Sequence, residues 1–303
     1  MDQHHELFED ESGIVKEQVW QSRIEELKNS IVPSSVFDLD QAIRKAVASR
    51  SKRPLALLFS GGVDSSLLAL LLKQGSASFT AYSVGIEKSQ DLGAAMAVAE
   101  ELQIPLKTRV LSLETVQEII EKLPSALQEA RFKDQNLSVL FGVASVEWAG
   151  IEMARENGYQ AIMGGLGSEE IFAGYERHAK AADINAECWS GLSTMWAKDL
   201  VRDASLAKAM NVTVLTPFLD RDLIKVAMGI SGDLKIKAGI KKACLRDAAV
   251  RMGLPQAFAD RKKMAAQYGS GIDKAIERIA KKQGFNSKHK FLDNLASRCE
   301  PLK

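Results

Sequence analysis

Cysteine is scarce in this sequence. The 303 residues include three cysteines, Cys188, Cys244 and Cys299, which are far apart and odd in number. No CxxC pair occurs, so we expect no zinc site, iron–sulfur site or redox dithiol. We do not expect a disulfide framework either, and this favours a reducing compartment.

A charge excess, a leader and a long apolar run are also lacking. Lys and Arg total 40 against 39 for Asp and Glu, a formal net charge of +1, so no overall field attracts nucleic acid. The polar start of the chain lacks the regions of a signal peptide, and the apolar run Leu67 to Leu72 is too short to cross a bilayer. We therefore expect a cytoplasmic protein, with neither a membrane nor nucleic acid as its partner.

Strand-like and helix-like segments alternate over the first half of the chain. Apolar, strand-like runs lie at 55–59, 79–84, 106–111 and 161–163. Helical patterns lie at 63–73, 91–102, 115–123 and 137–157, the last long enough for a buried helix. This alternation favours a doubly wound parallel sheet that binds ligands at the carboxyl ends of its strands. The expected fold class is α/β, with a helical part beyond residue 170.

The chain divides into three predicted parts. Residues 1–36 look like a peripheral N-terminal extension with one amphipathic helix near Val15 to Asn29. Residues 37–280 form the main domain, which begins with a helix near Asp38 to Ser49. Residues 281–303 form a basic C-terminal tail.

The segment Ser60 to Ser66, SGGVDSS, joins a predicted buried strand directly to a helix. Gly61 and Gly62 have no Cβ, so backbone N–H groups there can approach phosphate oxygens closely. The helix N-terminus adds unpaired N–H groups and a partial positive charge. Ser60, Ser65 and Ser66 add hydroxyl donors, so the loop is a candidate phosphate site.

Asp64 is the exception in this loop, because a carboxylate repels phosphate unless a cation lies between them. Mg²⁺ prefers oxygen ligands and would neutralise part of the phosphate charge. The pattern GxxxxGK[ST] is absent, so the loop is not a Walker A motif. A plain glycine turn is the alternative, but glycines, serines and an acid occur together here, which favours nucleotide binding.

SGGVDSS resembles the pyrophosphate loop of the N-type ATP pyrophosphatases, which cut ATP between its α and β phosphates and leave AMP on the substrate. Further segments resemble the synthetase domain of asparagine synthetases, in the same order and spacing from about residue 37 to 270. They are Tyr82 to Ile86 with Ser89 to Leu92, Gly164 to Tyr175 (the family's SGEGSDE-lFGGY), Pro217 to Asp220 (PFLD), and Lys242 to Arg246, Leu254-Pro255 and Arg261 to Lys263 (KxxLR, LP and RxK).

This resemblance implies an adenine-nucleotide α-hydrolase-like fold, with the ATP pyrophosphatase domain over residues 37–280. It also implies which residues hold the nucleotide. Leu58 and Val84 would contact adenine through backbone groups. Gly164 and Gly165 would lie against the ribose and phosphates.

The resemblance implies a catalytic group as well. Asp64 and Glu169 would hold Mg²⁺, with Glu169 standing where the family usually has Asp. Lys242, beside Lys241 on a predicted helix, would approach the phosphates and the charge that develops in the transition state. Glu169 follows a glycine-rich turn at a strand end, a place that suits an oxygen ligand facing a nucleotide. A solvated surface residue is the plain alternative for Glu169 and for Lys242.

Two residues depart from the family pattern. Leu166 replaces the first glutamate of SGEGSDE, and Leu215 replaces the arginine that stands two before PFLD. Both exchange charge for an apolar group, which puts aspartate in doubt as the acceptor. The chain also has Asp2 after Met1, where the family's glutaminase domain begins with a nucleophilic cysteine. We therefore expect it to use free ammonia, a separate glutaminase subunit or another nucleophile.

The leading hypothesis is an MgATP-dependent amido-ligase acting on a small-molecule acceptor, with AMP and pyrophosphate as products. A carboxylate or amide oxygen is adenylated and then displaced by ammonia or an amine. A tRNA-modifying enzyme with the same loop is one alternative, against which stand the missing cysteine pair and the balanced charge. A non-catalytic nucleotide-binding partner of a glutaminase is another, against which stand Asp64, Glu169 and Lys242. The sequence leaves open whether the protein forms a homo-oligomer.

Overall fold

A computed structural model of the chain describes residues 6–10, 13–130, 132–262 and 264–298. Its centre is a five-stranded sheet in the order β5-β4-β3-β6-β7, and every neighbouring pair is parallel. The strands are β3 (Leu55–Leu58), β4 (Phe79–Gly85), β5 (Leu106–Val110), β6 (Ala161–Met163) and β7 (Thr213–Leu215). The predicted parallel α/β fold is confirmed, and β7 is a fifth strand that the sequence did not indicate.

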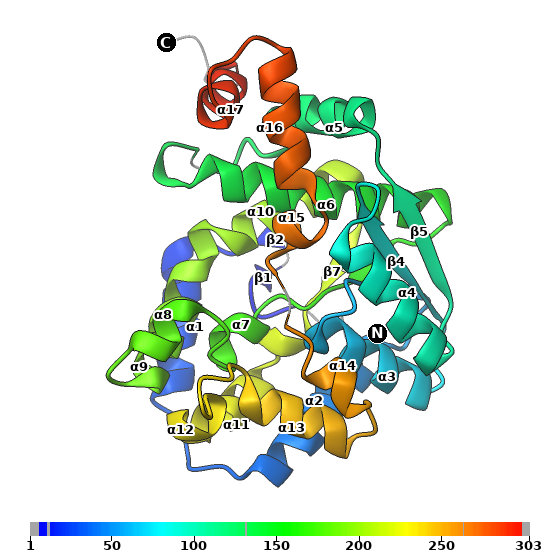
Figure 1. The fold of residues 1–303 in the computed structure, drawn as a ribbon. Coiled ribbons are helices and arrows are strands. Elements are labelled where there is room, and N and C mark those ends of the chain that lie inside the picture. Colours follow the sequence, from blue (N-terminus) through cyan, green and yellow to red (C-terminus); the bar gives the residue numbers. More distant parts are fainter. Residues whose placement is uncertain (1–5, 11–12, 131, 263, 299–303) are drawn as a thin grey trace.

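Alternate residues along β3 face opposite sides of the sheet, as the pleat of a strand requires. Leu55 and Leu57 pack into one apolar cluster, whereas Ala56 packs into a second cluster on the other side. Helices therefore cover both faces (Figure 1). The first cluster takes in α2 (Val36–Arg50), α3 (Val63–Gln74), α4 (Gln90–Leu102), α11 (Arg221–Gly229) and α13 (Ala243–Arg251).

The second cluster centres on the long helix α6 (Leu137–Glu156), which crosses the sheet beside β3 and β4. The helices around it are α5 (Leu113–Ala126), α10 (Asp199–Met210), α16 (Ile272–Lys282) and α17 (Lys288–Ser297). Among the described helices, α6 alone is long and apolar enough to cross a membrane, but 61% of its apolar stretch is buried inside the protein. The core helix of a globular domain has the same features, so this is weak evidence for a membrane span.

The strand order reverses between β3 and β6, because the chain extends the sheet first through β4 and β5 and then on the other side of β3. Loops at the carboxyl ends of such neighbouring strands diverge and leave a crevice, where ligands of doubly wound sheets bind. Here the two loops begin at Ser60 and Gly164. The fold therefore brings together two of the segments that the sequence analysis singled out.

The N-terminal extension is not peripheral. Helix α1 (Glu17–Lys28) packs against α9 (Ile184–Thr194), and Trp20 is fully buried, with its Nε1 donating to the carbonyl of Leu192 at 2.8 Å. Before it, β1 (Glu9–Asp10) and β2 (Gly13–Ile14) form a small antiparallel pair. The sequence predicted α1 as an amphipathic helix but not the elements that it packs against, because they lie far along the chain. The boundaries at 36 and 280 stay predictions.

The C-terminal half is mainly helical, as expected. The C-terminal segment is packed as well, because α17 buries Phe291 and Leu292, while residues 299–303, including Cys299, lie outside the described part. The other cysteines, Cys188 and Cys244, are buried free thiols. The remaining short elements are η1 (Phe132–Asp134), α7 (Ser168–Ile171), α8 (Glu176–Lys180), η2 (Met195–Ala197), η3 (Pro217–Leu219), α12 (Gly232–Lys235), α14 (Gln256–Ala259) and α15 (Ala266–Gly269).

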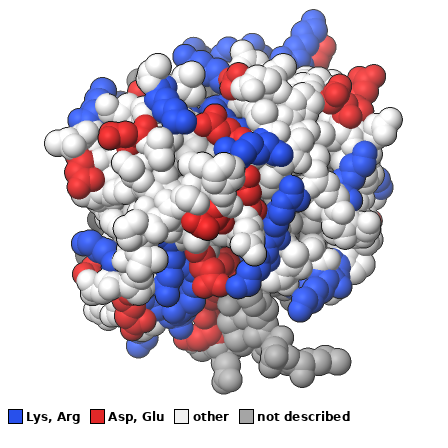
Figure 2. All heavy atoms as spheres, turned by 90° about the horizontal axis from the view of Figure 1, so that it is seen from below, with Lys and Arg blue, Asp and Glu red and all other residues white. Residues whose placement is uncertain are grey.

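The surface in Figure 2 carries acidic and basic side chains of both signs, interspersed with uncharged ones. On the described residues of this face there is no broad area of basic charge. Proteins that bind nucleic acid through its phosphates usually present a broad basic area.

Candidate active site

A cavity of about 680 Å³ opens at the carboxyl ends of β3, β4 and β6, where the strand order reverses. Most of the residues predicted to hold ATP and Mg²⁺ line it. They are Leu58, Ser60, Asp64, Ser65, Val84, Gly164, Gly165 and Glu169. Gly61, Gly62, Ser66 and Lys242 are not among the lining residues.

The SGGVDSS loop folds back on itself at the start of α3. The Ser65 hydroxyl accepts from the Ser60 N–H at 3.3 Å and donates to the Gly62 carbonyl at 3.2 Å. Gly62 is the N-cap residue, and no side chain caps the helix. The first N–H groups of this 12-residue helix therefore remain available to an anion, which is the arrangement that helix ends use where they bind phosphate. Ser66 differs from the prediction, because its hydroxyl is buried away from the cavity without a hydrogen-bond partner.

The glycines of the two loops serve different purposes. Gly61 has a φ of +66°, and a Cβ there would lie 2.7 Å from the Ala94 carbonyl carbon, so the close approach of α4 requires glycine. A Cβ on Gly165 would lie 3.2 Å from the Asp64 Cβ. A Cβ on Gly164 would meet no protein atom within 4 Å. Gly164 therefore faces open space that a ligand could fill.

Lys242 joins the two carboxylates predicted to hold Mg²⁺. Its Nζ lies 2.8 and 2.9 Å from the two Asp64 oxygens, 2.7 Å from Glu169 Oε1 and 3.1 Å from the Ser168 hydroxyl. The lysine is buried, with 4% of its surface exposed. Burial alone lowers the pKa of Lys242, but Asp64 and Glu169 outweigh it and raise that pKa above its usual value.

Lys242 does not lie within a helix, contrary to the prediction. It is the N-cap residue of α13 and has a φ of +57°, in the left-handed region. In this conformation the Lys242 ammonium contacts Asp64 and Glu169, so the left-handed residue lies at the candidate site, where strained backbone is often found. Close by, a Cβ on Gly174 would overlap the Glu169 carboxylate, so a larger residue there would displace that carboxylate from Lys242.

These groups suit a divalent cation in part. Asp64 and Glu169 converge on one point and offer the oxygen ligands that Mg²⁺ prefers, and the ammonium of Lys242 stands at that point as their cation. Among the described residues no group of three or more acidic, histidine or cysteine side chains could hold a metal ion. A magnesium ion there would therefore need further oxygens from a nucleotide or from water.

Arg261, part of the RxK segment, contacts both the SGGVDSS loop and α4. Its Nη1 donates to the Ser60 carbonyl at 3.3 Å, and its Nη2 lies 3.1 Å from Asp91 Oδ1. Asp91 lines the cavity and is buried. The sequence analysis gave neither residue a role, although both lie in segments that resemble the family. Lys263 of the same segment lies outside the described residues.

One end of the cavity is acidic, which the sequence analysis missed. Arg202 on α10 pairs with Glu147 at 3.0 Å and with Asp199 at 2.8 Å. Glu170 is buried beside them and accepts from the Tyr175 hydroxyl at 2.9 Å. Burial and the charge of Asp199 raise the pKa of Glu170 to about 7. Asp199 and Arg202 share α10, but Glu147 and Glu170 come from α6 and α7, so no single local pattern could have revealed the cluster.

The two departures from the family pattern lie in different surroundings. Leu166 lines the cavity next to Gly165. Leu215 is buried in the apolar core with 7% of its surface exposed and does not line the cavity. Of the two changes, Leu166 is therefore the one that alters the surface of the candidate site.

Known proteins are similar to this sequence over most of its length. The profile of the asparagine synthase family matches residues 38–188 and 178–296. A putative glutamine-hydrolyzing asparagine synthetase of Methanocaldococcus jannaschii is 31% identical over 299 residues, covering 85% of this chain and 54% of the relative. The nodule asparagine synthetase of Pisum sativum is 28% identical, covering 86% and 49%.

The chain thus spans about half the length of these curated relatives. Among solved structures, an NMN synthetase from Francisella tularensis covers 89% of this chain and 98% of its own, at 13% identity and a TM-score of 0.43. The family profile covers far more than half of the sequence, including the SGGVDSS loop, Glu169 and Lys242. The chain belongs to the asparagine synthase family.

Proposed function

We propose that the chain is an MgATP-dependent amido-ligase. It adenylates a carboxylate or amide oxygen of a small-molecule acceptor, releases pyrophosphate, and lets ammonia or an amine displace AMP. The observation that carries this proposal is the junction of Lys242 with Asp64 and Glu169 beside a cavity lined by the nucleotide loop. A cation, two carboxylates and a phosphate loop at one point are what cleavage between the α and β phosphates needs.

Each group has a task that follows from its position. The uncapped start of α3 and the loop hydroxyls of Ser60 and Ser65 bind phosphate oxygens. Asp64 and Glu169 would hold Mg²⁺, which supplies neutralisation of phosphate charge when it is bound. Lys242, already charged and desolvated, stabilises the negative charge that grows on the phosphates. Holding nucleotide and acceptor in one cavity supplies proximity.

The acceptor end of the cavity differs from the family pattern. Leu166 offers an apolar contact where a glutamate would orient an ammonium group or accept a proton. Glu170, with its pKa near 7, could take up a proton from the attacking nitrogen. Both relatives are named as glutamine-hydrolyzing. For this chain we propose ammonia or an amine as the attacking nitrogen, and Leu166 puts aspartate in doubt as the acceptor.

The position at which ATP is cut tests the proposal. Candidate acceptors are screened with ATP, Mg²⁺ and either ammonia or glutamine, and the nucleotide products are separated. AMP and pyrophosphate are expected with the correct acceptor, and no glutamate from glutamine. Formation of ADP and phosphate alone would contradict the assignment.

Asp64→Asn should weaken magnesium-dependent turnover. Asp247→Asn is the control and should not, because Asp247 forms an exposed ion pair with Lys237.

A further inference from the structure

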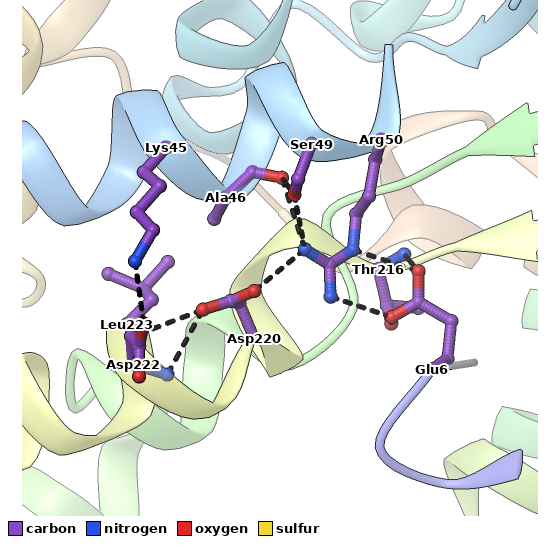
Figure 3. Close-up of polar contacts among 9 residues, drawn as sticks. All are labelled: Glu6, Lys45, Ala46, Ser49, Arg50, Thr216, Asp220, Asp222 and Leu223. Atoms are coloured by element: carbon purple, nitrogen blue, oxygen red, sulfur yellow. Dashed lines mark hydrogen bonds and ion pairs between the residues drawn. The ribbon is translucent and has the colours of Figure 1, made fainter. Parts of the chain in front are cut away.

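A buried carboxylate from the N-terminal segment reaches the wall of the cavity. Glu6 has 2% of its surface exposed, and Thr216, which follows β7, is fully buried. Glu6 Oε1 accepts from the Thr216 N–H at 3.2 Å, and Oε2 accepts from the Thr216 hydroxyl at 2.8 Å. The two residues are 210 positions apart in the chain, and Figure 3 shows both contacts.

Arg50, the last residue of α2, neutralises this carboxylate. Its Nε and Nη2 donate to the two Glu6 oxygens at 2.8 and 3.0 Å, a bidentate pair. Its Nη1 donates to Asp220 Oδ2 at 2.9 Å, and Asp220 caps α11 through the N–H groups of Asp222 and Leu223 (Figure 3). Such a buried pair is directional because every oxygen has a fixed donor, so it holds its partners in one arrangement.

Thr216 links this network to the glycine loop of the candidate site. Thr216 lines the cavity, and the preceding Leu215 accepts from the Gly164 N–H at 3.3 Å. Leu219, three residues after Thr216, also packs against this loop. A Cβ on Gly167 would lie 2.5 Å from the Leu219 Cδ2. The segment from Leu215 to Leu219 therefore supports the loop that carries Leu166 and leads to Glu169.

We propose that Glu6 is a positioning residue for the active site. With Arg50 it fixes Thr216, and through Thr216 it fixes the loop at 164–167 against which the nucleotide and acceptor are to bind. This role rests on the proposed function, since the loop is taken to hold ATP. The family profile begins at residue 38, so nothing in the family match assigns a role to this segment.

Amide hydrogen exchange of the ligand-free chain tests the positioning directly. In Glu6→Gln, the amides of Thr216 and Gly164 should exchange at least about tenfold faster, while those of α5 stay unchanged. Thr216→Val removes only the hydroxyl contact and should give the same local pattern with a smaller increase. Thr216→Val provides the test if Glu6→Gln does not fold. An equal increase throughout the chain, or none at these amides, would overturn the proposal.

The control is an ion pair between α2 and α11 that does not contact Thr216. Lys45 and Asp222 form an exposed pair at 2.9 Å, drawn in Figure 3, and Lys45→Met should leave the exchange of Thr216 and Gly164 unchanged. Binding of α,β-methylene-ATP with Mg²⁺ gives a second readout, which Glu6→Gln should weaken several-fold and Lys45→Met should not. If the unaltered chain does not bind this analogue but the local exchange effect is present, the proposed function fails while the positioning role stands.

Discussion

Lys242 has an unusual backbone conformation for its residue type. A left-handed conformation costs a non-glycine residue about 1 to 2 kcal/mol, yet Lys242 adopts it with a φ of +57°. The conformation lets the side chain turn from the start of α13 into the space between Asp64 and Glu169. Three buried or half-buried charged groups are thereby satisfied at one point, which offsets the strain.

In the ligand-free chain Lys242 and a divalent cation would compete for the same two carboxylates. Lys242→Met removes the ammonium, so we expect Mn²⁺ to bind about tenfold more tightly without nucleotide, because no ammonium then competes with it for the point between the two carboxylates. The loss of the free Mn²⁺ signal in electron paramagnetic resonance measures this affinity. Lys241→Met is the matched control, since Lys241 contacts Glu176 instead. Equal or weaker binding by Lys242→Met would remove these carboxylates from the metal site.

Leu166 is the residue at which the cavity departs from the family. If a carboxylate is needed there to make asparagine, the natural chain should make little asparagine even with saturating ammonia. Leu166→Glu should leave binding of α,β-methylene-ATP intact and lower use of the native acceptor about tenfold, because it places charge against an apolar contact. Leu166→Gln controls for shape without charge. Efficient asparagine formation by the unaltered chain would show that the family glutamate is dispensable.

Residue roles could be predicted only where a local motif carries them. Asp64 was singled out as the carboxylate of a phosphate-type loop and Glu169 by its resemblance to a family motif; the structure brings them together on Lys242, and their roles stay predictions. Glu6 lies in no such motif, and Glu170, although it lies in the segment that resembles the family signature, was given no role. Each looks like an ordinary acidic residue in the sequence, and its partners are set by packing between elements far apart in the chain.

At the scale of elements, periodicity predicted most of the first half well. The expected segments 79–84 and 161–163 coincide with β4 and β6, and 137–157 coincides with the buried helix α6. Two pieces escaped. Strand β7 has three residues, as β6 does, but it ends just before the PFLD turn and not in a glycine-rich loop like the one that marks the end of β6. The hairpin of β1 and β2 has only two residues in each strand.

Gly61 and Gly164 provide a paired test of how the loops are built. Gly61→Ala should lower the free energy of unfolding by roughly 2 kcal/mol or more, because the residue has a positive φ and α4 leaves no room for a Cβ. Gly164→Ala should change stability by less than about 0.5 kcal/mol, since open space surrounds that position. Urea denaturation measures both.

The same pair should respond in the opposite order when the nucleotide is added. Gly164→Ala should weaken binding of α,β-methylene-ATP about tenfold if the ribose and phosphates lie against it, because the new methyl group fills their space. Unchanged affinity would remove Gly164 from the nucleotide site. A fully stable Gly61→Ala would show that α4 can move away from the loop.

At the scale of the whole molecule, two buried groups near the site act on stability with opposite dependence on pH. His178 accepts at Nδ1 from the Tyr175 N–H, and burial together with the charge of Arg177 and nearby lysines lowers its pKa to about 4. Its neutral form is favoured in the folded state, so stability falls as the pH drops from about 6.5 to 4. Glu170 acts in the reverse direction, because its pKa is raised from 4.5 to about 7.

The contribution of Glu170 can be isolated by comparing the chain with Glu170→Gln, which resembles the protonated acid and can still accept from Tyr175. Below pH 4.5 the glutamate is protonated in both the folded and the unfolded chain, so the two proteins should be about equally stable. Between pH 4.5 and 7 only the unfolded chain releases the proton, so the natural protein should lose up to about 3 kcal/mol relative to the variant, and the difference should stay constant above pH 7. Urea denaturation of both proteins at pH 4.5, 6 and 8 measures it. A constant difference across this range would mean that Glu170 keeps an ordinary pKa, and it would remove this residue as a proton acceptor for the attacking nitrogen.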